Sequence, residues 1–315
     1  MTTNFEIFKL QIDDAVDIIE KASIVEKTNL NTLLSNKASL VDTNSLLERC
    51  EIACSAHEDK KPPLRITFHL ACSGGSLISK CLSAMPNVFL LSEVHPHTYR
   101  HLPENAQFLP SDIATLAKQA SIPNSDKLAK KIFIDSIKQT YLHVEEQGGT
   151  LILRDHSHSD FCVGTTIAEQ SIIVDLLSDH FDIIPLVTLR NPIDSYAALV
   201  ANWWLHFDPN DFNAYCERVN QFLAQYEPHQ IITYESFVEQ PQHVMKKMCE
   251  MLQITFDDMF EDLFDIYSVT GDSGRNTGVI APRKRRDLGD EIVQQIINSK
   301  EFTKLCKNHP VLATL

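Results

Sequence analysis

The chain has 315 residues, of which 43% are hydrophobic and 22% are charged, as in ordinary soluble globular proteins. This length suits one large α/β domain, or one domain with an appendage. The formal net charge of −14 argues against a general nucleic-acid-binding protein, because neutralising phosphates requires a basic surface.

The sequence also lacks the features of membrane, secreted and cysteine-paired metal proteins. No apolar run reaches the roughly 18 residues of a membrane-spanning helix, and the first residues lack the layout of a signal peptide. The eight cysteines include no Cys-x-x-Cys pair. We therefore expect reduced thiols, a cytoplasmic location, and neither a membrane nor a nucleic acid as partner.

The first part of the chain, residues 1–61, contains neither glycine nor proline. Its apolar residues recur every three or four positions, which is a helical period. We predict two domains: a helical N-terminal extension over 1–61 and an α/β domain over 62–315. The extension is expected to cover a sheet edge or to form a homodimer contact. A lid or a docking element for a partner is the alternative.

Beyond Pro63, near-continuous apolar runs alternate with helical segments. The runs lie at 66–71, 88–91, 151–153, 183–189 and 230–233, and helical segments at 125–146, 165–179, 192–204 and 212–226. Such runs are typical of strands buried on both faces, and strand-helix-strand units favour parallel pairing. We predict a three-layer α/β sandwich around a mostly parallel sheet of about five strands, with ligands at the carboxyl ends of the strands.

A short loop joins the first apolar run to a helical segment, and it reads Cys72-Ser73-Gly74-Gly75-Ser76-Leu77. A strand, a loop of small residues and a helix point backbone N–H groups and a helix N-terminus at an anion. The loop predicts a phosphate-bearing cofactor. It lacks the Gly-Lys-Ser/Thr ending of a Walker A loop, and glycine-rich turns also occur for packing reasons alone.

Two basic features accompany this loop. Arg190 ends a buried strand just before Pro192, and proline favours the first turn of a helix. An arginine there reaches phosphate through a bidentate fork, or forms a salt bridge at the strand end. The second feature is a basic segment of the acidic chain, whose glycines and proline favour a structured anion-binding loop over a solvated one. It contains Arg275, Arg283, Lys284, Arg285 and Arg286.

Together and in this order, the segments resemble the motifs of sulfotransferases that use 3′-phosphoadenosine-5′-phosphosulfate (PAPS). Residues 72–77 resemble the 5′-phosphosulfate loop, and the match extends to Glu93, as in the Glu-dependent branch with tyrosylprotein and bacterial small-molecule sulfotransferases. The segment from Arg190 resembles the 3′-phosphate loop. The family serine of that loop falls at Ala198, and Ser195 lies one turn earlier. The basic segment resembles the one that covers the 3′-phosphate.

The resemblance implies a P-loop NTPase-like fold and transfer of the sulfuryl group of PAPS to a hydroxyl or amine of a small-molecule acceptor. The transfer is an in-line displacement that needs no metal, leaves adenosine 3′,5′-bisphosphate, and has Glu93 as general base. The cofactor-binding residues that it implies are Cys72, Ser73, Gly74, Gly75, Ser76, Leu77, Arg190, Ser195, Arg275, Arg283, Lys284 and Arg285.

Alternatives remain at this point. His156 is a rival base, because the neighbouring Asp155 can orient its ring. Cys72 stands where the family has Arg or Lys, so either Arg154 or one of residues 283–286 supplies that charge, or catalysis is weak or absent. His156-x-His158 has no evident third ligand, and no metal is predicted. A kinase-like P-loop phosphotransferase and a non-catalytic nucleotide-binding protein on the same fold are the other two functions.

Overall fold

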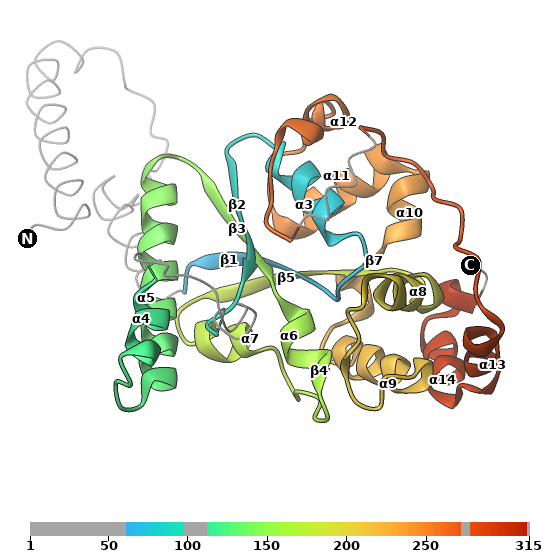
Figure 1. The fold of residues 1–315 in the computed structure, drawn as a ribbon. Coiled ribbons are helices and arrows are strands. Elements are labelled where there is room, and N and C mark those ends of the chain that lie inside the picture. Colours follow the sequence, from blue (N-terminus) through green and yellow to red (C-terminus); the bar gives the residue numbers. More distant parts are fainter. Residues whose placement is uncertain (1–60, 98–111, 272–277, 314–315) are drawn as a thin grey trace, which may run out of the picture. The chain divides into compact units, whose positions relative to one another are not determined.

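The computed structural model describes residues 61–97, 112–271 and 278–313 (Figure 1). Except for Lys61, the predicted N-terminal extension lies outside the described residues, and so does Arg275. None of the helices in the described ranges is both long enough and apolar enough to cross a membrane.

A parallel sheet of five strands, in the order β2-β3-β1-β5-β7, forms the centre of this part of the chain. This confirms the predicted α/β class and the parallel sheet of about five strands. A separate two-stranded parallel ladder pairs Val163 with His206 and Gly164 with Phe207. The strands are β1 (Pro63–His69), β2 (Val88–Val94), β3 (Thr150–Asp155), β4 (Val163–Gly164), β5 (Asp182–Leu189), β6 (His206–Phe207) and β7 (Ile231–Thr233).

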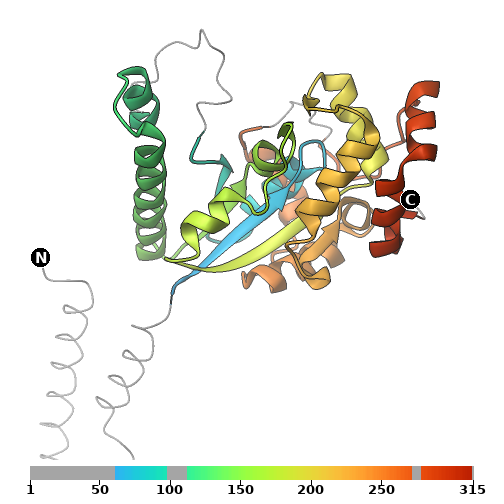
Figure 2. The same ribbon diagram turned by 90° about the horizontal axis from the view of Figure 1, so that it is seen from below.

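Helices cover both faces of the sheet (Figures 1 and 2). Alternate residues of a strand point to opposite faces. In β3, Leu151 and Leu153 accordingly join one buried apolar cluster, and Ile152 joins the other. The first cluster includes residues of α5, α6, α7, α8, α9 and α14, and the second includes residues of α3, α10, α11 and α12. The three layers predicted from the sequence are therefore present.

The helices are α3 (Gly75–Ser83), α4 (Ile113–Gln119), α5 (Ser125–Glu146), α6 (Ser157–Phe161), α7 (Ile172–Leu177), α8 (Pro192–Asn202), α9 (Phe212–Leu223), α10 (Tyr234–Glu239), α11 (Pro241–Leu252), α12 (Phe260–Leu263), α13 (Asp290–Asn298) and α14 (Lys300–Asn308). Short 3-10 turns, of which η3 (Phe264–Ile266) is one, complete the described elements.

The helix predicted over 165–179 is shorter than expected and covers only Ile172–Leu177. The buried guanidinium of Arg218 donates hydrogen bonds to the carbonyls of Phe161 and Gly164, each at 2.8 Å. A third bond, to the carbonyl of Thr166 at 3.4 Å, also ties the chain ahead of α7 to this arginine. The arginine comes from α9, about 55 residues later, so no local pattern could reveal its effect.

Helix α8 ends in a tight turn that separates two adjacent tryptophans. Trp203 has a left-handed φ of 60°, its N–H bonds to the carbonyl of Val200, and the N–H of Trp204 bonds to that of Leu199. This is the Schellman pattern, in which glycine usually takes the left-handed position. Trp203 is left 89% exposed, whereas Trp204 is 39% exposed.

We expect Trp203→Gly to raise the free energy of unfolding by up to about 1 kcal/mol. Glycine removes the steric cost of the left-handed conformation, and the exposed indole has little packing to lose. Urea denaturation measures the change. Trp204→Gly serves as the control and should lower stability, because more than half of that side chain is buried. Equal effects of the two substitutions would contradict this account of the turn.

Candidate active site

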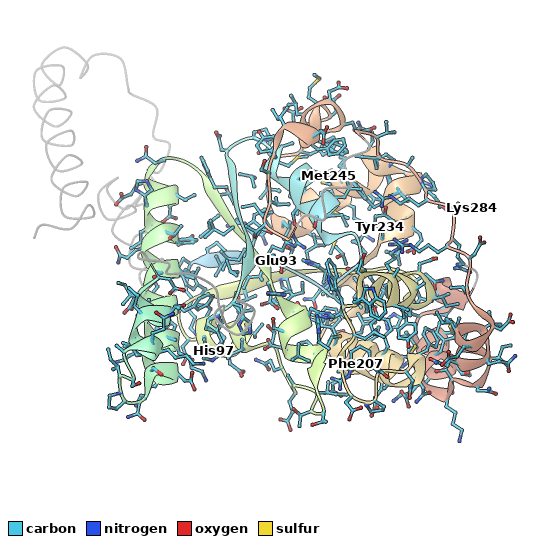
Figure 3. All side chains as sticks on the ribbon, in the orientation of Figure 1. Glu93, His97, Phe207, Tyr234, Met245 and Lys284 are labelled. Carbon is cyan, nitrogen blue, oxygen red and sulfur yellow. The ribbon has the colours of Figure 1, made fainter. Side chains whose placement is uncertain are left out.

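A cavity of about 920 Å³ lies at the carboxyl edge of the sheet, and each of the five strands brings a residue to it. His69 ends β1, Glu93 lies near the end of β2, and Arg154 lies near the end of β3. Arg190 follows β5 and Tyr234 follows β7. Figure 3 labels Glu93 and Tyr234. Open parallel sheets commonly bind their ligands at this edge, so the cavity is the first candidate for the functional site.

The loop between β1 and α3 forms one wall of this cavity. Gly74 has a φ of 89°, and a side chain there would collide with the ring of Tyr234. A side chain on Gly75 would collide with the ring of His69. The two glycines thus let the loop pass close to two aromatic rings. Helix α3 begins with no side-chain cap on its first N–H groups, and its first three residues, Gly75, Ser76 and Leu77, line the cavity.

Basic side chains gather around the loop although the chain is acidic overall. Arg190 donates from Nη1 to the carbonyl of Cys72 at 3.1 Å, and its guanidinium lies 5.1 Å from the ring centre of Tyr234. Lys80, one helical turn after Ser76, is buried in the cavity wall. The basic residues that line the cavity in the described ranges are Lys80, Arg154, Arg190 and Arg283.

Glu93 and Arg154 form a close ion pair within this wall. Arg154 Nη2 lies 2.6 Å from Glu93 Oε1, and the Arg154 side chain is 4% exposed. Its other donors reach His69 Nε2 at 2.8 Å, Ser92 Oγ at 2.9 Å and the carbonyl of Thr270 at 3.0 Å. The arginine is therefore held in one orientation by three elements, and it fixes the carboxylate in turn.

Two histidines contact this pair and are both neutral near pH 7. Burial, followed by the charge of Arg154, holds the pKa of His69 well below its usual range. Its Nε2 accepts the bond from Arg154 and so carries no proton. Burial, followed by the influence of His95, lowers the pKa of His156 to about 4. His156 Nε2 lies 3.3 Å from Glu93 Oε2, and the neutral ring donates there because a carboxylate only accepts.

Asp155 is a second carboxyl group at the end of β3, and it is fully buried. Its Oδ2 accepts hydrogen bonds from Ser157 Oγ at 2.7 Å and Ser171 Oγ at 3.0 Å. Burial, followed by the nearby Asp160, raises the pKa of Asp155 to about 8. The side chain is therefore a neutral acid at pH 7, held in place by two serine hydroxyls.

The raised pKa of Asp155 predicts a specific pH dependence of stability. Between its unfolded value of 3.8 and about 8, the folded protein holds a proton that the unfolded chain has lost, so this group's contribution declines as the pH rises. Asp155→Asn cannot ionise. Its melting temperature relative to the wild type should therefore increase from about pH 5 to about pH 9. Asp182→Asn, at an exposed position, is the control and should show no such trend. A constant difference for Asp155→Asn would contradict the pKa assignment.

The structure brings most of the sequence-predicted residues to this cavity, but not all of them. Ser73 Oγ is buried and bonds to the carbonyl of Leu70 at 2.7 Å. Ser195 Oγ donates to the carbonyl of Asn191, the residue that precedes α8, and accepts from Tyr215 Oη at 2.9 Å, away from the cavity. Lys284 is exposed and Arg285 pairs with Asp194 at 3.1 Å, and neither lines the cavity. The residues that do line it are Cys72, Gly74, Gly75, Ser76, Leu77, Glu93, His156, Arg190 and Arg283.

Sequence reasoning did not identify His69 or Lys80 as site residues. Each carried a signal, because His69 is the polar end of an apolar strand and Lys80 interrupts the apolar part of α3. Polar and charged side chains are rarely buried without a partner or a ligand, so such interruptions merit attention.

Comparison with known proteins gives a fold-level likeness only. No protein-family profile and no curated protein matches the sequence. The sulfotransferase domain from the curacin biosynthetic pathway is 15% identical over 80% of this chain and 99% of its own, with a TM-score of 0.47. Mouse sulfotransferase SULT7A1, solved with PAP, is 12% identical over 81% of this chain and 88% of its own, with a TM-score of 0.44. Likenesses this distant do not tell what the present chain binds or catalyses.

Proposed function

We propose that this protein is a sulfotransferase that moves the sulfuryl group of PAPS to a hydroxyl or amine of a small-molecule acceptor. One observation carries the proposal. The uncapped N-terminus of α3, which favours an anion, opens on the same cavity as a carboxylate fixed by a buried arginine, Glu93 with Arg154. A site of this kind offers anion binding and proton removal side by side.

The residues present fit PAPS in charge and in size. The N–H groups at the start of α3 and the hydroxyl of Ser76 suit the 5′-phosphosulfate, and Arg190 with Arg283 suits the 3′-phosphate. The hydroxyl of Ser76 donates to the carbonyl of Gly271 at 3.1 Å, and both residues line the cavity. The cavity of about 920 Å³ falls within the range that holds cofactor-sized molecules.

Glu93 is the base in this proposal. PAPS supplies an activated sulfuryl group, and transfer forms the bond from acceptor to sulfur while the bond from sulfur to the phosphate oxygen breaks. Glu93 takes the acceptor proton. Arg154 and the ring N–H of His156 hold the carboxylate in place through its two oxygens. A positioned base of this kind contributes roughly 10²–10⁴ in rate.

Calorimetry with adenosine 3′,5′-bisphosphate, and separately with ATP and magnesium, tests the proposal. We expect the bisphosphate to bind in the micromolar range and ATP to bind at least about tenfold more weakly. Arg190→Met should weaken bisphosphate binding by about tenfold or more, because it removes a charge-assisted contact. Lys304→Met, an exposed lysine outside the cavity, is the control. Preferred binding of ATP would favour a kinase-like enzyme, and binding of neither would favour a non-catalytic protein.

A further inference from the structure

One wall of the cavity differs in chemistry from the rest, and we call it the ladder wall. It consists of His158, Val163, Trp204 and His206. Val163 of β4 pairs with His206 of β6 in the small ladder, and the ring centres of His158 and His206 lie 6.3 Å apart. Trp204 follows the turn that ends α8. Three separate segments thus bring aromatic rings and an aliphatic side chain to one surface.

The ladder wall carries no fixed charge, whereas the rest of the cavity is strongly charged. Its four residues include no lysine, arginine, aspartate or glutamate. The basic residues of the cavity belong to α3, to the ends of β3 and β5, and to the C-terminal segment. Asp155 and His156, the two ionisable residues that precede His158 in the chain, are neutral near pH 7 because burial shifts the pKa of each. An anionic ligand would therefore find no lysine or arginine on this wall.

The two tryptophans show that the apolar surface of this wall belongs to the cavity. Trp203 and Trp204 are adjacent in sequence, but the left-handed turn at Trp203 sends them to different surroundings. Only Trp204 lines the cavity, and there it remains 39% exposed, as does Val163. An indole and an isopropyl group left open beside two imidazoles suit a flat ring with few polar groups.

We propose that the ladder wall binds the acceptor, that the acceptor is an uncharged phenol-type compound, and that Trp204 selects it by packing against its ring. This inference rests on the proposed function, which places PAPS at the loop side of the same cavity and makes Glu93 the base. The phenolic proton goes to Glu93, as for any hydroxyl acceptor. Trp204 is then a specificity-determining residue, and Trp203 has no role in binding.

The chain has two tryptophans, so each single variant makes the other one the only indole reporter. We would titrate Trp203→Phe and Trp204→Phe with p-cresol, p-hydroxybenzoate and cyclohexanol while following indole fluorescence. We expect p-cresol to change the emission of Trp204 saturably and to leave that of Trp203 unchanged. The charged and the non-planar analogues should bind at least about tenfold more weakly. Equal responses of the two indoles, or equal binding of p-hydroxybenzoate, would overturn the proposal.

Kinetics provide a second test that separates this inference from the proposed function. Trp204→Ala should raise the KM for p-cresol by about tenfold or more and leave the Kd of the bisphosphate unchanged, whereas Trp203→Ala should alter neither. If the bisphosphate binds but p-cresol does not perturb Trp204, the proposal that the ladder wall binds the acceptor is wrong and the proposed function stands. If p-cresol perturbs Trp204 but the bisphosphate does not bind, the sulfotransferase proposal fails and the wall remains a phenol-binding surface.

Discussion

Glu93→Gln is expected to lower the turnover number by about 10²–10⁴ while leaving the Kd of adenosine 3′,5′-bisphosphate unchanged. Glutamine has nearly the shape of glutamate, and its amide oxygen can still accept the bond from Arg154 Nη2, now 2.6 Å long. It cannot take a proton from the acceptor. Single-turnover assays with PAPS, together with calorimetry of the bisphosphate, measure the two quantities on the same preparation.

The matched control for this variant is Glu239→Gln, because Glu239 is exposed at the end of α10 and does not line the cavity. It should retain full turnover. Full activity of Glu93→Gln would instead show that Glu93 only holds Arg154 in place. His156 would then become the candidate base, acting through the ring nitrogen that does not face Glu93.

Arg154→Lys should reduce turnover by about two orders of magnitude and lower the free energy of unfolding by several kcal/mol. One ammonium group cannot reproduce the fork that now reaches Glu93, His69, Ser92 and Thr270. Losing these bonds leaves buried groups unpaired and lets the carboxylate move. Urea denaturation and turnover assays measure the two losses.

Arg65→Lys is the control for the arginine at the active site. Arg65 also lies on a strand and donates to backbone carbonyls, those of Leu252 and Pro63, but it lies toward the amino end of β1, opposite the cavity. The control should show a modest loss of stability and normal turnover. A stability loss without any loss of turnover in Arg154→Lys would mean that the ion pair is structural only.

Local patterns in the sequence were sufficient to predict the strands of the sheet but not the order in which the strands pair. All five apolar runs are strands, because near-continuous runs require burial on both faces. Helix α8 begins at Pro192 as expected but ends two residues early. Trp203 there takes a left-handed conformation, which the neighbouring sequence does not predict. The strand order depends on pairing between distant segments, such as Ile66 with Leu153, and periodicity carries no information on that.

The same division holds for the candidate site. The loop follows β1 and Glu93 lies near the end of β2. The carboxyl ends of parallel strands meet at one edge, so the convergence of the two was predictable. The environment of each side chain was not predictable from the sequence. Ser195 bonds to Tyr215 of α9, a partner that no motif specifies, and Arg285 reaches Asp194 instead of the cavity. The role of Ser195 and Arg285 in holding a 3′-phosphate stays a prediction from resemblance.

The contact between Arg154 and Thr270 links the site to the order in which the chain is made. Chains fold as they are synthesised, beginning from the amino end. The strands that carry His69, Glu93 and Arg154 are complete by residue 155, yet the arginine gains its last acceptor only when Thr270 has emerged, more than a hundred residues later. A nascent chain can therefore contain the three strands β1, β2 and β3 well before it holds a finished site, and a truncated product ending before Thr270 would carry an incomplete site.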